Sequence, residues 1–272
     1  MKYLYISLLC CFSALKCFAQ SDSTKTTFTL AAIYSTNSNY YGQTSESRLP
    51  YVLTNGTLRF PAGLYFSASA YKLLNTQESS TVSATALGAG FELNLGKNVT
   101  ADLNYQHTFY PSTSPMLQAA NNNIASASLT YAWWLSTGLS VDYAFGDQED
   151  IFATFGVSKQ ISLGSFSDRD IITLSPGVEI VGGSRHYYNE YVVKKNKGLF
   201  GNILPGGFQD ETVKEFSSNF DLMSYNLKLP LAYNRSHYIF EAAYQLSVLG
   251  KQPELTSTKT NSFLNLSFYY QF

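Results

Sequence analysis

Three histidines, one serine and a few acidic residues are the side chains whose type and spacing could support acid–base or nucleophilic chemistry. His186 follows Ser184 by two residues, and an imidazole that lies beside a hydroxyl can take its proton. This pair stands at the start of a long predicted loop, so we interpret the spacing as chance. His107 has aromatic residues two positions away on both sides, and His237 falls in a predicted tight turn. The histidines therefore predict no catalytic pair.

Acidic residues of predicted loops offer a second possibility for chemistry. Asp147, Asp150, Asp210 and Glu211 could act with a loop histidine in a protease site, but charged side chains in loops are usually solvated. The sequence has no Cys/His metal motif, no phosphate-binding glycine motif and no nucleophile elbow. We therefore expect no enzyme activity, no metal and no cofactor, and keep a hydrolase as the weakest of three functional interpretations.

The composition excludes several classes of protein. The 272 residues carry a formal net charge of −1, which is too balanced for a nucleic-acid-binding protein. Only 14% of the residues are charged, whereas soluble surfaces carry about 25–35%, and aromatic residues reach 15%. After residue 20 there is no run of 18 apolar residues, so the sequence offers no transmembrane helix. An all-β chain whose aromatic residues alternate with Ser, Thr and Asn would combine these features.

The N-terminal segment has the pattern of a secretory signal peptide. An apolar stretch at residues 3–15 is followed by Cys17 and Ala19, which are small residues at the −3 and −1 positions of a cleavage site. The alternative is a lipoprotein anchored at Cys17, which fits less well because a lysine precedes it. The sequence thus predicts a signal peptide at 1–19, which contains all three cysteines, and a mature chain at 20–272.

The mature chain alternates apolar and polar residues along most of its length. In residues 99–109 the odd positions are mostly apolar, and the even positions are all Thr, Asp, Asn or Gln. Such segments form strands with one apolar and one polar face. A soluble sandwich turns the apolar faces inward, whereas a transmembrane barrel turns them towards lipid. Because the predicted strands reach about 10 residues, enough to cross a bilayer, we predict a closed antiparallel transmembrane β-barrel.

The last predicted strand carries a short motif. Every second residue from Leu264 to Phe272 is apolar or aromatic. Phe268, Tyr270 and Phe272 resemble the terminal strand of bacterial outer-membrane β-barrels, which the barrel-assembly machinery reads in that family. The resemblance implies that this machinery is a partner during biogenesis and that outer-membrane lipid surrounds the barrel. The cleavage site and the abundant Tyr, Asn and Ser also resemble those of outer-membrane proteins of Bacteroidota.

The predicted barrel has about twelve strands in up-and-down order, and an even number closes the sheet without an unpaired edge in lipid. Short joins alternate with mostly longer connections, and in barrels of this family the short turns and both termini lie in the periplasm. The predicted short joins are 61–63, 96–98, 136–137, 164–169 and 234–237, and the predicted strands span 25–35, 50–60, 64–73, 81–95, 99–110, 123–135, 138–146, 151–163, 170–182, 215–233, 238–250 and 260–272.

A few positions disturb the alternation. The apolar phase changes near Met223–Ser224, which predicts a β-bulge. Pro176 and Pro230 each lack an N–H for the strand ladder, so we expect irregularity beside them. Lys159 would face lipid near the periplasmic end, where its long side chain can reach the interface.

Seven charged side chains would face the lumen if the alternation is kept. They are five acids and two bases, an excess that would attract cations in a narrow channel. The alternative is that these charges pair with one another and fill the barrel. Twelve strands lie between the filled 8-stranded barrel and the open 16-stranded porin, so a narrow water column is possible. The predicted lumen-lining residues are Arg59, Glu92, Asp102, Asp142, Glu179, Lys228 and Glu241.

Three functional interpretations follow from the predicted fold. The first is a narrow passive channel for small hydrophilic solutes in the cell outer membrane, with a mild preference for cations. The second is a non-conducting barrel that binds partners or serves as a structural element through its extracellular loops. The predicted long loop at 183–214 contains an apolar run, and we expect it to fold over the mouth or to extend the wall. The third is a barrel-embedded hydrolase.

Overall fold

Fourteen β-strands are the regular elements of the computed structural model, which describes residues 25–45, 47–74, 82–111, 114, 116, 121–184, 220–250 and 259–272. The predicted signal peptide and almost all of the predicted loop at 183–214 lie outside these residues. No helix among the described residues is both long and apolar enough to cross a membrane. The strands are β1 (Thr27–Ser35), β2 (Tyr51–Arg59), β3 (Leu64–Leu73), β4 (Ala84–Asn94), β5 (Val99–Phe109), β6 (Asn123–Ala132), β7 (Ser136–Phe145), β8 (Glu149–Ser158), β9 (Ile161–Gly164), β10 (Asp170–Leu174), β11 (Gly177–Ser184), β12 (Phe220–Arg235), β13 (Tyr238–Leu249) and β14 (Thr260–Gln271).

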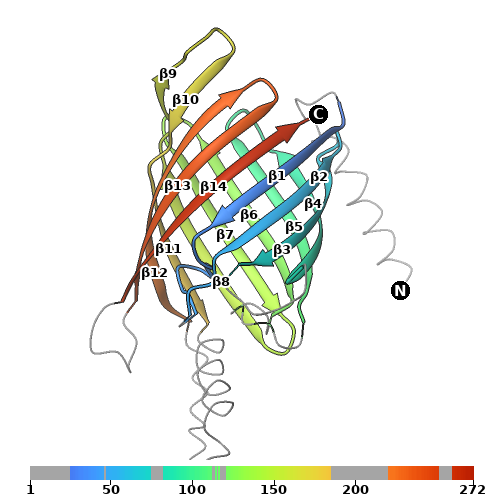
Figure 1. Ribbon diagram of the computed structural model, residues 1–272, viewed down its shortest axis with the longest axis vertical. Helices are drawn as coiled ribbons and strands as arrows, with labels where there is room; N and C mark the ends of the chain where they lie inside the picture. Colours follow the sequence, from blue (N-terminus) through green and yellow to red (C-terminus); the bar gives the residue numbers. More distant parts are fainter. Residues whose placement is uncertain are drawn as a thin grey trace, which may run out of the picture.

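Twelve of these strands close into one antiparallel barrel (Figure 1). Each strand from β1 to β7 pairs with the next one in the chain, β8 pairs with β11, and β12, β13 and β14 complete the ring. The seam between β14 and β1 runs from Thr29 paired with Gln271 to Ser35 paired with Asn265. The predicted up-and-down barrel of about twelve strands is therefore confirmed.

The barrel turns its apolar faces outward. Along β14, Leu264, Leu266 and Phe268 are 38–43% exposed, whereas the intervening Ser267 is 4% exposed. The same pattern of exposed Leu, Phe and Tyr recurs on the other strands of the ring. A surface of this kind is unfavourable in water and favourable against lipid acyl chains. The alternative of a soluble sandwich, which hides its apolar faces, does not fit.

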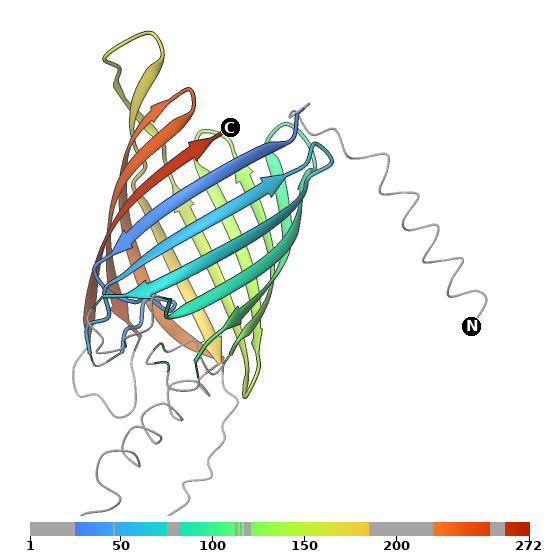
Figure 2. The ribbon, with the colours of Figure 1, turned by 45° about the vertical axis from the view of Figure 1, so that its right-hand side comes forward.

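Two ends of the barrel can be distinguished (Figure 2). One end, called here the turn end, carries the short turns after β2, β4, β6 and β12, together with the start of β1 and the end of β14. The opposite end, called here the loop end, carries the turn 146–148 and the described parts of the connections 36–50 and 110–122. Short connections thus lie mainly at one end of the barrel and longer connections mainly at the other, as the sequence predicts.

Some predicted joins were wrong at their boundaries, and the join at 234–237 is shorter because Asn234 and Arg235 still pair with β13. The join at 136–137 is displaced, because Trp133–Leu135 makes the turn and Ser136 already begins β7. Both tryptophan side chains of this turn are exposed, which suits a membrane–water interface. The segment predicted as a loop at 147–150 is shorter, because Glu149 and Asp150 already pair with β7.

A hairpin of two short strands leaves the ring at the turn end (Figure 1). The predicted strands 151–163 and 170–182 are each interrupted, which separates β9 from β8 and β10 from β11. Pro176 lies at the second break, and its carbonyl accepts a hydrogen bond from the Lys159 N–H at 3.0 Å. Strand β10 pairs with the end of β12, whereas β9 pairs only with β10 among the described strands. The ring has no free edge, but this hairpin has one.

Strand β12 contains the predicted bulge. Ser224 pairs with Val181 and Leu222 pairs with Gly182, so Met223 is the extra residue. The shift lets apolar residues on both sides of it face outward, and the prediction is confirmed. Pro230 keeps its register with β13, and the irregularity expected beside it lies on the facing strand, at the break between β10 and β11.

Candidate functional site

The inner face near the turn end carries an ion pair that water can reach. Arg59 Nη1 of β2 lies 2.7 Å from Glu92 Oε2 of β4, and the guanidinium lies 5.0 Å from the centre of the Tyr65 ring. The two charged side chains are 35% and 36% exposed although they stand inside a closed barrel. Solvent therefore reaches this pair at the turn end of the barrel, where Arg59 is the last residue of β2.

Asp102 of β5 belongs to a hydrogen-bonded group beside that pair. The Tyr65 hydroxyl is 3.0 Å from each carboxylate oxygen, and Asn104 Nδ2 donates a hydrogen bond at 2.8 Å. The Tyr65 ring lies over Gly90, where an added Cβ would be 2.3 Å from the ring. Only glycine leaves room for this arrangement. Within the described residues no Lys or Arg forms an ion pair with Asp102, so its negative charge remains in the lumen.

The opposite wall carries a second ion pair. Lys228 Nζ of β12 lies 2.7 Å from Glu179 Oε1 of β11. Glu241 of β13 is partly buried and has no ion-pair partner in the part of the chain that the structure describes. Of the seven side chains predicted to line the lumen, four are thus paired. Among the described residues, Asp102, Asp142 and Glu241 form no ion pair with a basic side chain.

The connection between β1 and β2, residues 36–50, folds into the loop end, and we call it the mouth loop (Figure 2). At its tip the Tyr41 hydroxyl donates a hydrogen bond to Asp142 Oδ2 of β7 at 2.8 Å. The Ser224 hydroxyl of β12 donates to the Tyr41 carbonyl at 2.9 Å. Because β7 stands on the far side of the ring from β1, the tip reaches across the lumen.

Gly42 allows the tip of the mouth loop to approach the wall. Its φ is +87°, and an added Cβ would lie 2.5 Å from Ser224 Oγ and 2.9 Å from Asn226 Oδ1. Its carbonyl accepts a hydrogen bond from Asn261 Nδ2 of β14 at 2.9 Å. The preceding Tyr41 has a φ of 52°, which is uncommon for a bulky residue. Such backbone strain persists where surrounding contacts hold it in place.

Aromatic packing fills part of the loop end around this tip. The Tyr41 ring stacks on Phe152 of β8 at 3.9 Å, and Tyr40 meets the same ring edge-on at 5.4 Å. Burial raises the pKa of Tyr41, and the negative charge of Asp142 raises it further, so the hydroxyl stays protonated and continues to donate. A second apolar cluster lies on the β2–β3 side and consists of Leu49, Leu73 and Met116 with Tyr51, Tyr71 and Tyr110. The two clusters narrow the mouth.

Asp150 is a buried acid that the sequence analysis placed wrongly in a solvated loop. It is 1% exposed on the inner face of β8, where Asn121 Nδ2 donates to its Oδ2 at 2.6 Å and the Ser184 hydroxyl donates to its Oδ1. The sequence signal for this inward position was the period of two: Asp150 and Phe152 face inward, and Ile151 between them faces outward. The Ser184 hydroxyl therefore acts as a hydrogen-bond donor to a carboxylate. His186, Asp210 and Glu211 lie outside the described residues.

Within the part of the chain that the structure describes, the contacts of His107 and His237 are with an amide and with aromatic rings. His107 Nδ1 lies 2.8 Å from Asn123 Oδ1 on the neighbouring strand, and its ring stands edge-on to Phe109 at 4.4 Å. His237 lies in the turn between β12 and β13, with its ring 6.4 Å from that of Tyr270. Among the described residues, no group of three or more His, Cys, Asp or Glu side chains is placed to hold a metal ion.

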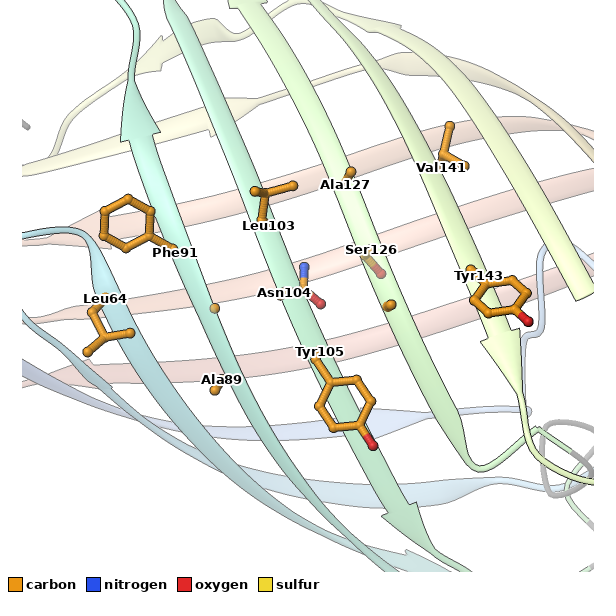
Figure 3. A pocket seen from close by; sticks show the side chains of 12 residues that line it. Leu64, Ala89, Phe91, Leu103, Asn104, Tyr105, Ser126, Ala127, Val141 and Tyr143 are labelled. Atoms are coloured by element: carbon orange, nitrogen blue, oxygen red, sulfur yellow. The ribbon is translucent and has the colours of Figure 1, made fainter. Parts of the chain in front are cut away.

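A groove of about 670 Å³ lies on the outer surface of β3–β7 (Figure 3). Three alanines are among its lining residues, and Phe91, Leu103 and Tyr105 stand around it, whereas Asn104 and Ser126 point to the inner face. Because the side chains that face outward around it are apolar or aromatic, the groove suits a lipid acyl chain rather than a hydrophilic ligand.

The terminal aromatics lie on the outer surface next to the seam. Phe268 is 6.1 Å from the Tyr238 ring of β13, and the Tyr270 and Phe272 rings meet edge-on at 4.7 Å. The Phe272 N–H donates to the Phe28 carbonyl of β1 at 2.9 Å. The role of these residues as an assembly signal stays a prediction. At the same end, Lys159 Nζ lies 5.7 Å from the Trp134 ring centre, a contact suited to the interface.

Comparison with known proteins places the barrel among solved structures of the same fold. No protein-family model matches the chain, and no curated protein matches it. The structure of KdgM porin is similar with a TM-score of 0.50 at 8% identity, covering 90% of this chain and 99% of that one. NanC porin gives 0.47 at 7% identity over 89% and 98%, and LpxR from Salmonella typhimurium gives 0.47 at 9% over 90% and 99%. The chain thus has the fold of the outer-membrane β-barrels.

Proposed function

We propose that this protein is an outer-membrane channel for small hydrophilic solutes, narrowed at its loop end by the mouth loop. The observation that carries the proposal is the exposure of Arg59 and Glu92 inside the closed barrel. A barrel filled by its own side chains would bury such a pair, and burying charges is costly. A water-filled inner face beneath a narrowed mouth is the arrangement of a selective pore.

The apolar exterior supports a place in the outer membrane, reached with the predicted signal peptide at 1–19 and the barrel-assembly machinery as a partner. With the turn end in the periplasm, the mouth loop faces the outside of the cell. Solutes would then meet the narrow mouth first and the wider, hydrated part of the lumen afterwards.

We propose a mild preference for cations within this channel. The pairs Arg59–Glu92 and Lys228–Glu179 cancel their own charges, whereas Asp102, Asp142 and Glu241 lack a basic partner among the described residues. In a lumen where water screening is reduced, the remaining negative charges attract cations and repel anions.

A second candidate is a non-conducting barrel that acts through its outer loops. The observation that favours it is the packing of the mouth, where the aromatic cluster around Phe152 and the cluster around Leu73 occupy the loop end. If the two clusters seal the cross-section, the hydrated lumen is a closed vestibule and no solute passes.

Single-channel recording in planar bilayers separates the two candidates. The wild-type protein is compared with a variant in which residues 38–45 are replaced by two glycines, which removes the tip of the mouth loop but not its ends. A channel predicts small, discrete openings in the wild type and a several-fold larger conductance in the variant. Absence of conductance in both proteins, with the barrel shown to be folded by heat-modifiable migration, would leave the non-conducting barrel.

A further inference from the structure

We propose that the outer surface of the barrel binds a glycolipid whose sugar headgroup carries no charge. The acyl chain lies in the groove on β3–β7, and the sugar lies beyond its loop end, on a hydrogen-bonded cluster of Tyr105, His107 and Asn123. Both parts of this site face the surrounding lipid and not the lumen. The site is therefore independent of the proposed channel.

The groove is the apolar part of the site. Its volume of about 670 Å³ lies within the range of small-molecule sites, about 300–1,000 Å³. It is hollow because Tyr105 is paired on the outer face with Ala89 on one side and with Ala125 on the other, and Leu103 is paired with Ala127. An acyl chain that lies among these side chains gains more van der Waals contacts than one that lies on a flat wall.

The polar cluster is built around the amide of Asn123, the first residue of β6. Its Oδ1 accepts a hydrogen bond from the Tyr105 hydroxyl at 2.7 Å and lies 2.8 Å from His107 Nδ1. Its Nδ2 donates to the Phe145 carbonyl at 3.1 Å, which defines the orientation of the amide because a carbonyl can only accept. Tyr105 belongs to both parts of the site, and its side chain extends from the groove towards the end of β5 (Figure 3).

The imidazole of His107 offers a free acceptor to a headgroup. Because Asn123 Oδ1 can only accept, the proton of the neutral ring must lie on Nδ1, and Nε2 keeps its lone pair. Among the described residues no group donates a hydrogen bond to Nε2. A sugar hydroxyl can make that bond. The Phe109 ring, edge-on to the imidazole at 4.4 Å, adds apolar surface for the carbon-bound hydrogens of a sugar.

The charges on this side of the barrel favour a sugar over a phosphate. The sequence has no Lys or Arg between Lys97 and Lys159, so the wall from β5 to β8 has no basic side chain with which to bind a phosphate. Glu149, which is exposed and directly opposite Phe145 in the register of β7 and β8, would repel one. A carboxylate can instead accept hydrogen bonds from hydroxyl groups. An uncharged headgroup that is rich in hydroxyls fits these side chains.

Native mass spectrometry of the purified full-length barrel, released from detergent, tests the headgroup. The probes are a glucosyl diacylglycerol and a phosphatidylglycerol with the same acyl chains, supplied in equal amounts. We expect the wild type to retain the glucosyl lipid with a several-fold preference. His107→Phe keeps an aromatic ring but removes the acceptor, and it should abolish the preference. Equal retention of the two lipids by the wild type, which ordinary surrounding lipid would give, overturns the proposal, as do a preference for phosphatidylglycerol and an absence of bound lipid.

A second variant tests the groove separately. Ala127→Leu fills the groove and leaves the polar cluster intact, so it should reduce the retention of both lipids several-fold. The matched control is Ala242→Leu on the outer face of β13, where the alanine stands between Leu231 and Leu266 in the register. This control should retain lipid as the wild type does. Heat-modifiable migration shows that each variant is folded. Unchanged retention in Ala127→Leu would exclude the groove as the acyl-chain site, and no readout depends on whether the barrel conducts.

Discussion

The Tyr41 hydroxyl donates a hydrogen bond to Asp142 at 2.8 Å, and the two residues are 101 positions apart in the chain. This contact fixes the tip of the mouth loop to the far wall of the barrel. It also gives Asp142 two roles in the proposed channel, because the carboxylate holds the loop and keeps its negative charge. The width of the mouth and its electrostatic potential are therefore coupled at one residue.

Replacing Gly42 with alanine should release the tip of the mouth loop. The left-handed backbone costs a residue with a Cβ about 1–2 kcal/mol, and the new methyl would lie 2.5 Å from Ser224 Oγ. That exceeds the net free energy of a typical hydrogen bond, about 0.5–1.5 kcal/mol. We expect larger single-channel conductance with little change in the heat stability of the barrel. Gly138→Ala is the matched control, because its nearest atom would be 3.8 Å away; equal conductance of the two variants would contradict the prediction.

Alkaline titration should find Tyr40 and Tyr41 among the last tyrosines to ionise. Burial raises the pKa of both hydroxyls. A group with a raised pKa in the folded state contributes stability that is complete below its ordinary pKa, about 10 for tyrosine, and that is lost as the pH rises through the higher value. The closed mouth should thus persist to about pH 10. Ultraviolet absorbance of tyrosinate measures this, and Tyr41→Phe should remove a late component of the curve; loss of an early component would refute the assignment.

Removing two lumenal charges should weaken cation selectivity. Asp102→Asn combined with Asp142→Asn deletes two negative charges, and each asparagine oxygen can still accept the tyrosine hydrogen bond seen in the wild type. Reversal potentials in a salt gradient should move towards zero. The control is Glu179→Gln with Lys228→Met, which removes a neutral pair and should leave the potential almost unchanged. A double variant that behaves as the wild type would reject the selectivity role.

The hairpin outside the ring should loosen when Asp170 loses its charge. Its carboxylate accepts hydrogen bonds from the Ser167 hydroxyl at 2.6 Å and from the Phe166 N–H at 2.7 Å, and the Ser167 bond is the main reason that its pKa is lowered. A lowered pKa gives stability that is present above the ordinary value, about 3.9, and that is lost as the pH falls below it. Asp170→Asn should speed proteolysis at 165–169 at neutral pH. Asp168→Asn, an exposed neighbour, should not; equal cleavage of both would argue against this role.

Deleting Phe272 should slow membrane insertion more than it destabilises the finished barrel. The ring is 65% exposed, and it lies 4.7 Å from the Tyr270 ring and 5.9 Å from the Phe28 ring. Heat-modifiable migration of the protein from cells reports insertion, and unfolding of the purified protein reports stability. Phe166→Ala, which removes another exposed aromatic side chain at the same end, is the control. Normal insertion of the deletion variant would argue against a signal.

The barrel could be predicted from the sequence because the patterns that define its strands involve only neighbouring residues. Alternation of exposed and inward residues within each strand defines the faces, and the change of phase at Met223 identifies the bulge from a few neighbouring residues. Strand breaks beside Pro176 follow from a missing N–H. These features depend on backbone geometry that neighbouring residues share.

The mouth could not be predicted in the same way because its contacts are distant in sequence. Tyr41 and Gly42 look like residues of an ordinary loop until β7, β12 and β14 surround them. Asp150 reads as a turn residue because only folding brings Asn121 and Ser184 to its carboxylate. Contacts between residues on different sides of the lumen produce no repeating pattern in the sequence.

The seam between β1 and β14 has a consequence for the order of the chain. The Phe272 N–H reaches the Phe28 carbonyl, so the ends of the described barrel lie on neighbouring strands at the same rim. A short linker could join them, and a new start could be opened at the turn Ser236–His237, giving a circular permutant with the same ring of neighbours. Refolding of that permutant in detergent to a heat-modifiable barrel would show that no strand is intrinsically the first or the last. Which strand comes first and which comes last in the native chain would then follow from the direction of synthesis and not from the architecture of the barrel.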